Sequence, residues 1–144
     1  MDEVSPLPPV LTVHRDYLLP VTAREFGVCG EQNLEAGCYD GCRFIDSTGK
    51  EWSIRKVRTL GYSSAIHRYL PRAYRKVRVS FDLVYAREYS LGDLKSLVGE
   101  FLLNNKLVGS PFADKGKEVP SYLERFDSVR HLIAEVGYFD ARRQ

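Results

Sequence analysis

Apolar and polar residues alternate along residues 75–86, RKVRVSFDLVYA. The apolar residues occupy the odd positions: Val77, Val79, Phe81, Leu83 and Tyr85. Successive side chains of a β-strand point to opposite faces, so this period of two predicts a half-buried strand. Most of these residues are β-branched or aromatic, as strand positions favour. We expect this strand to organise the fold, with Phe81 buried between the sheet and the helices.

Residues 41–60 predict a β-hairpin that pairs with this strand. Two extended segments, GCRFID (41–46) and EWSIRKVRTL (51–60), flank a turn in which Gly49 supplies the positive φ of a tight turn. Trp52 and Ile54 share one face of the second segment, whereas Val57 falls on the opposite parity. A β-bulge near residues 55–56 restores the phase, and we prefer it to a strand covered on both faces. Together with the central strand, the hairpin indicates an antiparallel meander of three or four strands.

The longest helical pattern follows the central strand. Its apolar stripe consists of Leu91, Leu94, Leu97, Val98, Phe101 and Leu102, which predicts an amphipathic helix over residues 91–104. Ser90 and Asp93 have the spacing of a capping box, with Asp in the place of the usual Glu. Residues 109–120 are typical of a surface loop. A second helix is expected from Ser121 or Asp127 to Gly137, either continuous or broken at residues 127–128.

The remaining segments predict little regular structure. Residues 1–9 contain three of the seven prolines, so we expect an irregular N-terminal segment. Residues 10–13 suit a short edge strand, and residues 20–26 suit one or two helical turns with Thr22 as N-cap and Gly27 as the stop. Residues 27–41 and 61–74 predict loops, the second with a short turn of helix as the alternative. The expected fold class is α+β: residues 10–144 form a single domain in which a small, mainly antiparallel sheet packs against two C-terminal helices.

Composition is that of an ordinary globular chain, with 144 residues of which 44% are hydrophobic and 28% charged. No apolar run approaches the roughly 18 residues of a membrane span, and Met1-Asp2-Glu3 lacks the basic and apolar regions of a signal peptide. We therefore expect a cytoplasmic protein that does not bind membranes. Three cysteines in a chain without an export signal favour reduced thiols over a disulfide framework.

The net charge of +2 is unevenly distributed along the chain. Residues 1–51 carry −5, residues 52–87 carry +8 with nine bases and one acid, and residues 88–144 carry −1. Such asymmetry indicates a partner surface of opposite sign more than it indicates a fold. The basic segment coincides with the central strand.

No motif in the chain predicts catalysis, a cofactor or a metal. The candidate metal ligands are Cys29, Cys38 and Cys42, with His14, His67 or His131 as a fourth. Structural zinc usually takes two ligand pairs, whereas this chain has one C-x₃-C and a third, distant cysteine, so we expect no metal. Cys42 is interpreted as a small core residue. A phosphate-binding glycine loop and a nucleophile elbow are absent from the sequence, and no cysteine opens a helix beside a basic residue. We therefore expect a non-catalytic protein.

The most suggestive segment for binding is residues 68–78, RYLPRAYRKVR, where arginines and tyrosines interleave. Arginines bind phosphates or carboxylates in bidentate fashion, and tyrosines stack on bases or fill a partner's pocket. The residues assigned to partner binding are Arg68, Tyr69, Arg72, Tyr74 and Arg75. Lys76 and Arg78 are better explained as the solvent face of the strand. Protein binding is the preferred interpretation and nucleic-acid binding the alternative.

Residues 41–104 contain, in order, a strand ending in Asp46, a Thr48-Gly49 turn, a strand bearing Trp52, a loop, a basic strand and a Leu-rich helix. This layout resembles that of small immunity proteins of bacterial toxin–immunity systems. The resemblance implies a non-catalytic bacterial protein that neutralises a cognate toxin by covering its working surface. Immunity proteins against nucleases are usually acidic, whereas the central segment here is basic. Either the toxin presents an acidic surface to it, or the acidic N-terminal third forms the interface.

Overall fold

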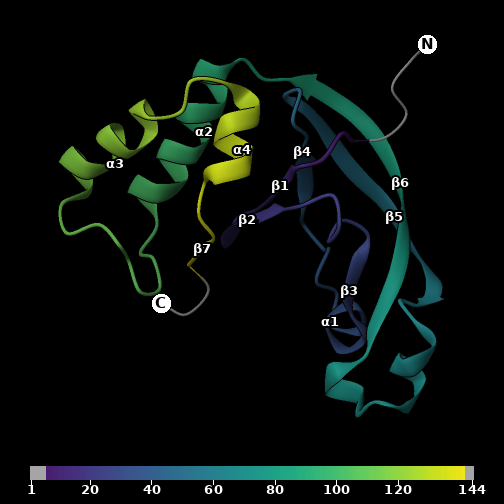
Figure 1. Cartoon of the computed structure of the whole chain (residues 1–144). Helices are drawn as coiled ribbons and strands as arrows, with labels where there is room; N and C mark the ends of the chain where they lie inside the picture. Colours follow the sequence, from purple (N-terminus) through teal and green to yellow (C-terminus); the bar gives the residue numbers. More distant parts are fainter. Residues whose placement is uncertain (1–5, 142–144) are drawn as a thin grey trace.

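A curled antiparallel sheet forms the centre of the computed structural model, which describes residues 6–141 (Figure 1). Its strands are β1 (Val10–His14), β2 (Tyr17–Val21), β3 (Val28–Gly30), β4 (Arg43–Ile45), β5 (Lys50–Tyr62), β6 (Lys76–Glu88) and β7 (Phe139–Asp140). The spatial order is β3-β6-β5-β4-β1-β2-β7. Helices pack on this sheet, which confirms the expected α+β class.

The two long strands, β5 and β6, pair along their whole length and bend as they do so (Figure 1). The pairing register shifts at three places, one of them between Ile54 and Lys56. Each shift inserts a bulge that increases local twist and bends the strand. The bulge predicted near residues 55–56 is therefore confirmed.

The turn between β4 and β5 depends on Gly49. Its φ is 91°, and a Cβ atom there would lie 2.5 Å from the carbonyl oxygen of Tyr89. The Tyr89 N–H in turn donates a hydrogen bond to the Gly49 carbonyl at 2.8 Å. This close approach lies where the chain passes from β6 into the helix that begins at Leu91. Only glycine satisfies both the backbone angle and the contact.

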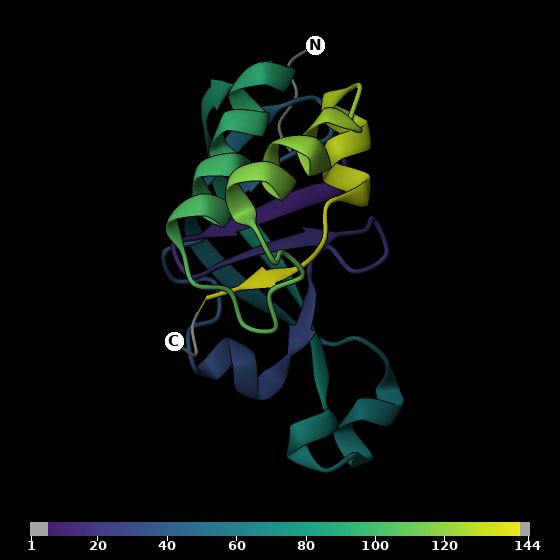
Figure 2. The same cartoon turned by 90° about the vertical axis from the view of Figure 1, so that its left-hand side faces the viewer.

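Three helices cover one face of the sheet (Figures 1 and 2): α2 (Leu91–Asn104), α3 (Lys115–Glu124) and α4 (Val129–Glu135). α2 has the predicted bounds and the predicted capping box between Ser90 and Asp93. The break at residues 127–128 is real, because Ser128 caps α4. The core residues beneath the helices include Leu11, Leu18, Ile45, Leu94, Val98, Leu102, Phe126 and Ile133. No helix within residues 6–141 is both long and apolar enough to cross a membrane.

The start of α3 corrects the expected loop over residues 109–120. Gly116 and Pro120 make the segment a poor helix by propensity, and Pro120 lies inside the helix. The Glu118 N–H nevertheless donates to the Asp114 carbonyl at 2.8 Å, and Val119 is buried against the core. Tertiary packing thus overrides local propensity, and three helices pack on the sheet where two were expected.

The opposite face of the sheet carries a second apolar cluster. Val10, Phe44 and Trp52 form its buried centre, and Phe26, Tyr39, Ile54, Phe81 and Leu83 pack around them. Phe81 lies here, with ring centroids 5.0 Å from both Phe44 and Tyr39. The expectation that Phe81 lies between the sheet and the helices is wrong. The alternation in β6 is real, but its apolar face is covered by residues 22–42.

The first strands also differ from expectation. β1 is not an edge strand, since it pairs with both β2 and β4. The predicted helical turns over residues 20–26 reduce to one hydrogen-bonded turn, in which Phe26 N–H donates to the Thr22 carbonyl at 3.0 Å. Thr22 does cap this turn, and Gly27, with φ 82°, ends it. Strand β2 was not predicted, because it contains Pro20 and proline is rare inside strands. In the structure, Pro20 lies beyond Tyr17 and Leu18, the two residues of β2 that pair with β7.

Residues 27–41 contain β3 and a short helix, α1 (Glu31–Glu35), where a loop was expected. Elements this short have no measurable periodicity in the sequence. At the N-terminus, residues 6–9 contain neither helix nor strand, and residues 1–5 of the expected irregular segment lie outside the described residues.

Candidate binding surface

Residues 60–75, here called the tip, comprise the last residues of β5 and the segment that joins β5 to β6. They contain two 3₁₀ turns, η1 (Ala65–Tyr69) and η2 (Arg72–Tyr74), as the alternative prediction of short helical turns allowed. The Ser63 N–H donates to the Lys76 carbonyl at 2.9 Å, and the Lys76 N–H donates to His67 Nδ1 at 3.1 Å. Figures 1 and 2 show the tip projecting from the end of the paired strands β5 and β6 that lies away from α2, α3 and α4.

The five residues assigned to partner binding from the sequence all lie on the tip. Arg68, Tyr69, Arg72 and Tyr74 are exposed, whereas Arg75 is half-buried. The guanidinium carbon of Arg68 lies 6.0 Å from the centroid of the Tyr69 ring. Four of the five side chains are thus available to a partner.

Two large aliphatic side chains, Leu60 and Ile66, accompany them, and sequence reasoning missed these two. The most exposed large hydrophobic residues of the described chain are Tyr69 (79%), Tyr74 (69%), Leu60 (66%) and Ile66 (62%), and all four belong to the tip. Isolated exposed apolar residues are common, but a gathering of the four most exposed on one projection is informative. For Ile66 the available signal was its position in residues 61–74, which were predicted to form a loop.

Helix α1 supports the tip from one side. Glu35 forms an ion pair with Arg72, and Glu31 Oε2 lies 3.9 Å from Arg75 Nη1. The Glu31 N–H also donates to the Arg75 carbonyl at 2.9 Å, and Arg75 Nε donates to the Leu70 carbonyl at the same distance. Arg75, and in part Arg72, therefore hold the tip in place. The spacing of Glu31 and Glu35 by four residues was the sequence signal for this acidic helix face.

Basic side chains continue from the tip along both long strands. Within residues 6–141, no carboxylate forms an ion pair with the following exposed residues: Arg55, Lys56, Arg58, Arg68, Lys76 and Arg78. Arg58 and Lys56 lie opposite Ser80 and Asp82 in the β5–β6 pairing. Asp82 is the one acid of residues 52–87, so the surface beside the tip is positively charged.

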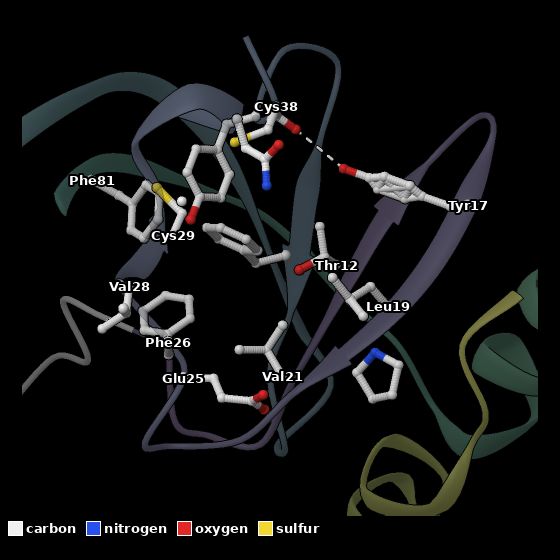
Figure 3. A pocket seen from close by; sticks show the side chains of 16 residues that line it. Thr12, Tyr17, Leu19, Val21, Glu25, Phe26, Val28, Cys29, Cys38 and Phe81 are labelled. Carbon is white, nitrogen blue, oxygen red and sulfur yellow. Dashed lines mark hydrogen bonds between the residues drawn. The ribbon is translucent and has the colours of Figure 1, made fainter. Parts of the chain in front are cut away.

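A cavity of about 250 Å³ opens on the sheet face that the helices leave uncovered (Figure 3). Its walls come from β1 and β2, from the segment that contains β3 and α1, and from Phe44 and Phe81. Cys29 and Cys38 both line it, and neither was assigned a role from the sequence. β3 brings Cys29 to this face by pairing it with Val77 of β6.

The third cysteine, Cys42, does not line this cavity and is buried, as the core interpretation expected. Its sulfur is 3.0 Å from the hydroxyl of Tyr17, which donates a hydrogen bond to the Cys38 carbonyl at 3.1 Å. No disulfide joins the three cysteines. Among the residues that the structure describes, no group of three His, Cys, Asp or Glu side chains is arranged to hold a metal ion.

No family model, no curated protein and no solved structure matches the chain.

Proposed function

We propose that the protein is a non-catalytic protein-binding module whose interface is the tip. The observation that carries the proposal is the gathering of Leu60, Ile66, Tyr69 and Tyr74, the most exposed large apolar side chains, beside Arg68. Tyrosine and arginine dominate the energetic centres of protein interfaces, and exposed apolar clusters mark such surfaces.

The charge around the tip indicates the chemistry of the partner. Residues 52–87 carry a net +8, and their exposed basic side chains flank the apolar cluster. A partner with an acidic rim around an apolar pocket would match both features. Opposite charge accelerates association, while the desolvated apolar centre supplies most of the affinity.

The support from α1 favours binding by a preformed surface. Arg72 and Arg75 are fixed by Glu35 and Glu31, so the backbone that carries Tyr69 and Tyr74 is held before a partner arrives. A surface ordered in advance loses less conformational entropy on binding. The same ion pairs reduce the positive charge that the tip offers to a polyanion.

The proposed partner class is a toxin domain, which the protein would neutralise in the bacterial cytoplasm by direct binding. This part of the proposal is supported by the resemblance of residues 41–104 to small immunity proteins. In the structure those residues form β4, β5, the tip, β6 and α2. The exposed basic side chains of β5 and β6 beside the tip would face an acidic working surface on the toxin.

Nucleic-acid binding is the second candidate, favoured by the exposed cations of β5 and β6 that lack ion pairs. Phosphate contacts by such residues produce binding with little sequence preference. The exposed Leu60 and Ile66 argue against it, since aliphatic side chains contribute little to a phosphate-binding surface.

The deciding experiment is affinity capture from the native source with two baits. One bait is the wild-type protein, and the other carries Ile66→Ser, Tyr69→Ala and Tyr74→Ala. A single stoichiometric protein that is retained by the first bait, lost with the second and resistant to nuclease treatment supports the proposal. Recovery that disappears after nuclease treatment supports the second candidate. Equal recovery of a partner by both baits would overturn the assignment to the tip.

A further inference from the structure

The cavity in Figure 3 is lined by two cysteines that lie on either side of α1 in the sequence. Cys29 lies in β3, fixed by pairing with β6, and Cys38 lies in the loop that follows α1. The Cys38 N–H donates to the Asn33 carbonyl at 3.0 Å, which holds that loop against α1. Both side chains are half-buried and line the same cavity, so a small molecule in the cavity can contact either sulfur.

The two thiols interact directly and unequally. A hydrogen bond from the Cys38 side chain, with a further one from Tyr39, lowers the pKa of Cys29 to about 7, although burial acts in the opposite direction. The same interaction, together with burial, raises the pKa of Cys38 well above its ordinary value. Near neutral pH, Cys29 is therefore a thiolate in a large fraction of molecules, while Cys38 keeps its proton.

Other titratable or charged groups near Cys29 do not reverse the difference in pKa between Cys29 and Cys38. Burial, the first cause, and the neighbouring cysteines raise the pKa of Tyr39, so its hydroxyl remains a donor. Glu25 is the carboxylate that lines the cavity. Lys76 and Arg78 flank Val77 on β6, and strand alternation directs them to the other face of the sheet.

We propose that Cys29 and Cys38 form an oxidation site that takes hydrogen peroxide as its oxidant. The Cys29 thiolate attacks one peroxide oxygen and the O–O bond breaks. The leaving hydroxide takes up a proton to become water, and Cys29 becomes a sulfenic acid. The Cys38 sulfur then attacks the Cys29 sulfur, and the S–O bond breaks. The departing hydroxyl leaves as water with the Cys38 proton, so two thiols are oxidised to one disulfide and one peroxide is reduced to two waters.

Cys42 is excluded from this role by its surroundings. It is buried, and its sulfur lies against the Tyr17 hydroxyl, whereas Cys38 faces the cavity. A bond between Cys29 and Cys38 would close a short loop around α1. Oxidation thus acts on the segment that also supports the tip, but the proposal stands without any binding function.

The test uses the reduced full-length protein, hydrogen peroxide at neutral pH and peptide mapping under non-reducing conditions. We expect a linked pair of peptides containing Cys29 and Cys38, lighter than the sum of the free peptides by two hydrogens and separable by a reductant. Cys38→Ser should stop the reaction at the sulfenic acid, captured on Cys29 by dimedone. Cys29→Ser should slow oxidation of the remaining thiols roughly tenfold, because the thiolate fraction falls.

Cys42→Ala is the matched control and should preserve both the linkage and its rate. Mapping of the wild-type protein decides the matter even if a variant fails to fold. A Cys38–Cys42 linkage, disulfides between molecules only, or a sulfenic acid that forms first on Cys38 would each overturn the assignment. So would an unchanged rate in Cys29→Ser.

Discussion

Trp52 Nε1 donates a hydrogen bond to Asp46 Oδ2 at 3.1 Å, joining β5 to the turn that follows β4. Asp46 is only 1% exposed. Its other oxygen, Oδ1, accepts from the Thr48 N–H at 2.9 Å, the Thr48 hydroxyl at 2.6 Å and the Lys50 N–H at 3.1 Å. The Leu7 N–H reaches Oδ2 at 3.3 Å. One buried carboxylate thus orders the turn, the indole and the segment before β1.

Replacement of this carboxylate should be costly. Asp46→Ala leaves several buried donors without an acceptor, and we expect the free energy of unfolding to fall by about 3 kcal/mol. Urea denaturation measures the loss. Asp40→Ala, at an exposed position in the loop before β4, is the matched control and should change stability by less than about 0.5 kcal/mol. A loss below about 1 kcal/mol for Asp46→Ala would contradict the role of the carboxylate.

On the sheet face of the second apolar cluster, the loss of unfolding free energy on truncation to alanine should follow how deeply each side chain is buried. Phe44 is 1% exposed, so Phe44→Ala should cost about 3–5 kcal/mol. Phe81 packs on the same ring but is only partly buried, so Phe81→Ala should cost less, about 2–3 kcal/mol. Tyr85 lies further along the same face of β6 and is exposed, so Tyr85→Ala should cost below about 1 kcal/mol. Equal losses for Phe81 and Tyr85 would mean that residues 22–42 do not cover this face.

The acidity of Cys29 predicts a pH profile for its alkylation. Because its pKa is lowered to about 7, the rate of iodoacetamide labelling should rise with pH, reach half its maximum near pH 7 and then level off. In denaturant the midpoint should move up to about pH 8.5, the value of an ordinary thiol. Mass spectrometry of the Cys29 peptide follows the reaction.

Two variants separate the causes of this shift. Cys38→Ala removes the larger stabilising hydrogen bond and Tyr39→Phe the smaller, so both should move the midpoint upward, and Cys38→Ala should move it further. A midpoint that stays near pH 7 in Cys38→Ala would contradict the thiol pairing.

Local pattern predicted the parts of the fold that depend on neighbours in sequence. The alternation of Val77, Val79 and Phe81 identified β6, the parity change at Val57 identified a bulge, and Ser90 marked the start of α2. What covers each face was not predictable, because alternation reports that a face is buried and not which segment buries it. Phe81 was assigned to the wrong cover for this reason.

The candidate sites divide in the same way. The tip was found because its arginines and tyrosines are contiguous in sequence, although the exposure of Leu60 and Ile66 needed the structure. The pairing of Cys29 with Cys38 depends on β3 adding to β6, a contact between residues far apart in sequence. No spacing rule for cysteines could reveal it.

The tip should bind a protein partner through its aromatic side chains. Once a partner is isolated, Tyr69→Ala and Tyr74→Ala should each weaken binding by about 2 kcal/mol, since anchors in a desolvated centre carry most interface energy. Leu60→Ala should also weaken binding, whereas Leu103→Ala on α2, another exposed leucine, should leave affinity unchanged. Titration calorimetry gives the affinities, and chemical denaturation confirms that each variant remains folded.

Salt dependence separates this outcome from nucleic-acid binding. For a protein partner, Arg68→Ala should mainly lower the association rate, and added salt should act in the same way. For duplex DNA, affinity should fall steeply with salt, with a log–log slope of about −0.9 for each neutralised phosphate, and Arg68→Ala should reduce that slope by about one. We expect the first pattern, because Arg72 and Arg75 are already paired with carboxylates of α1 and the remaining surface of the tip is largely apolar. Submicromolar binding to generic DNA at about 150 mM salt, unaffected by Tyr69→Ala, would show that the basic strands and not the tip form the working surface.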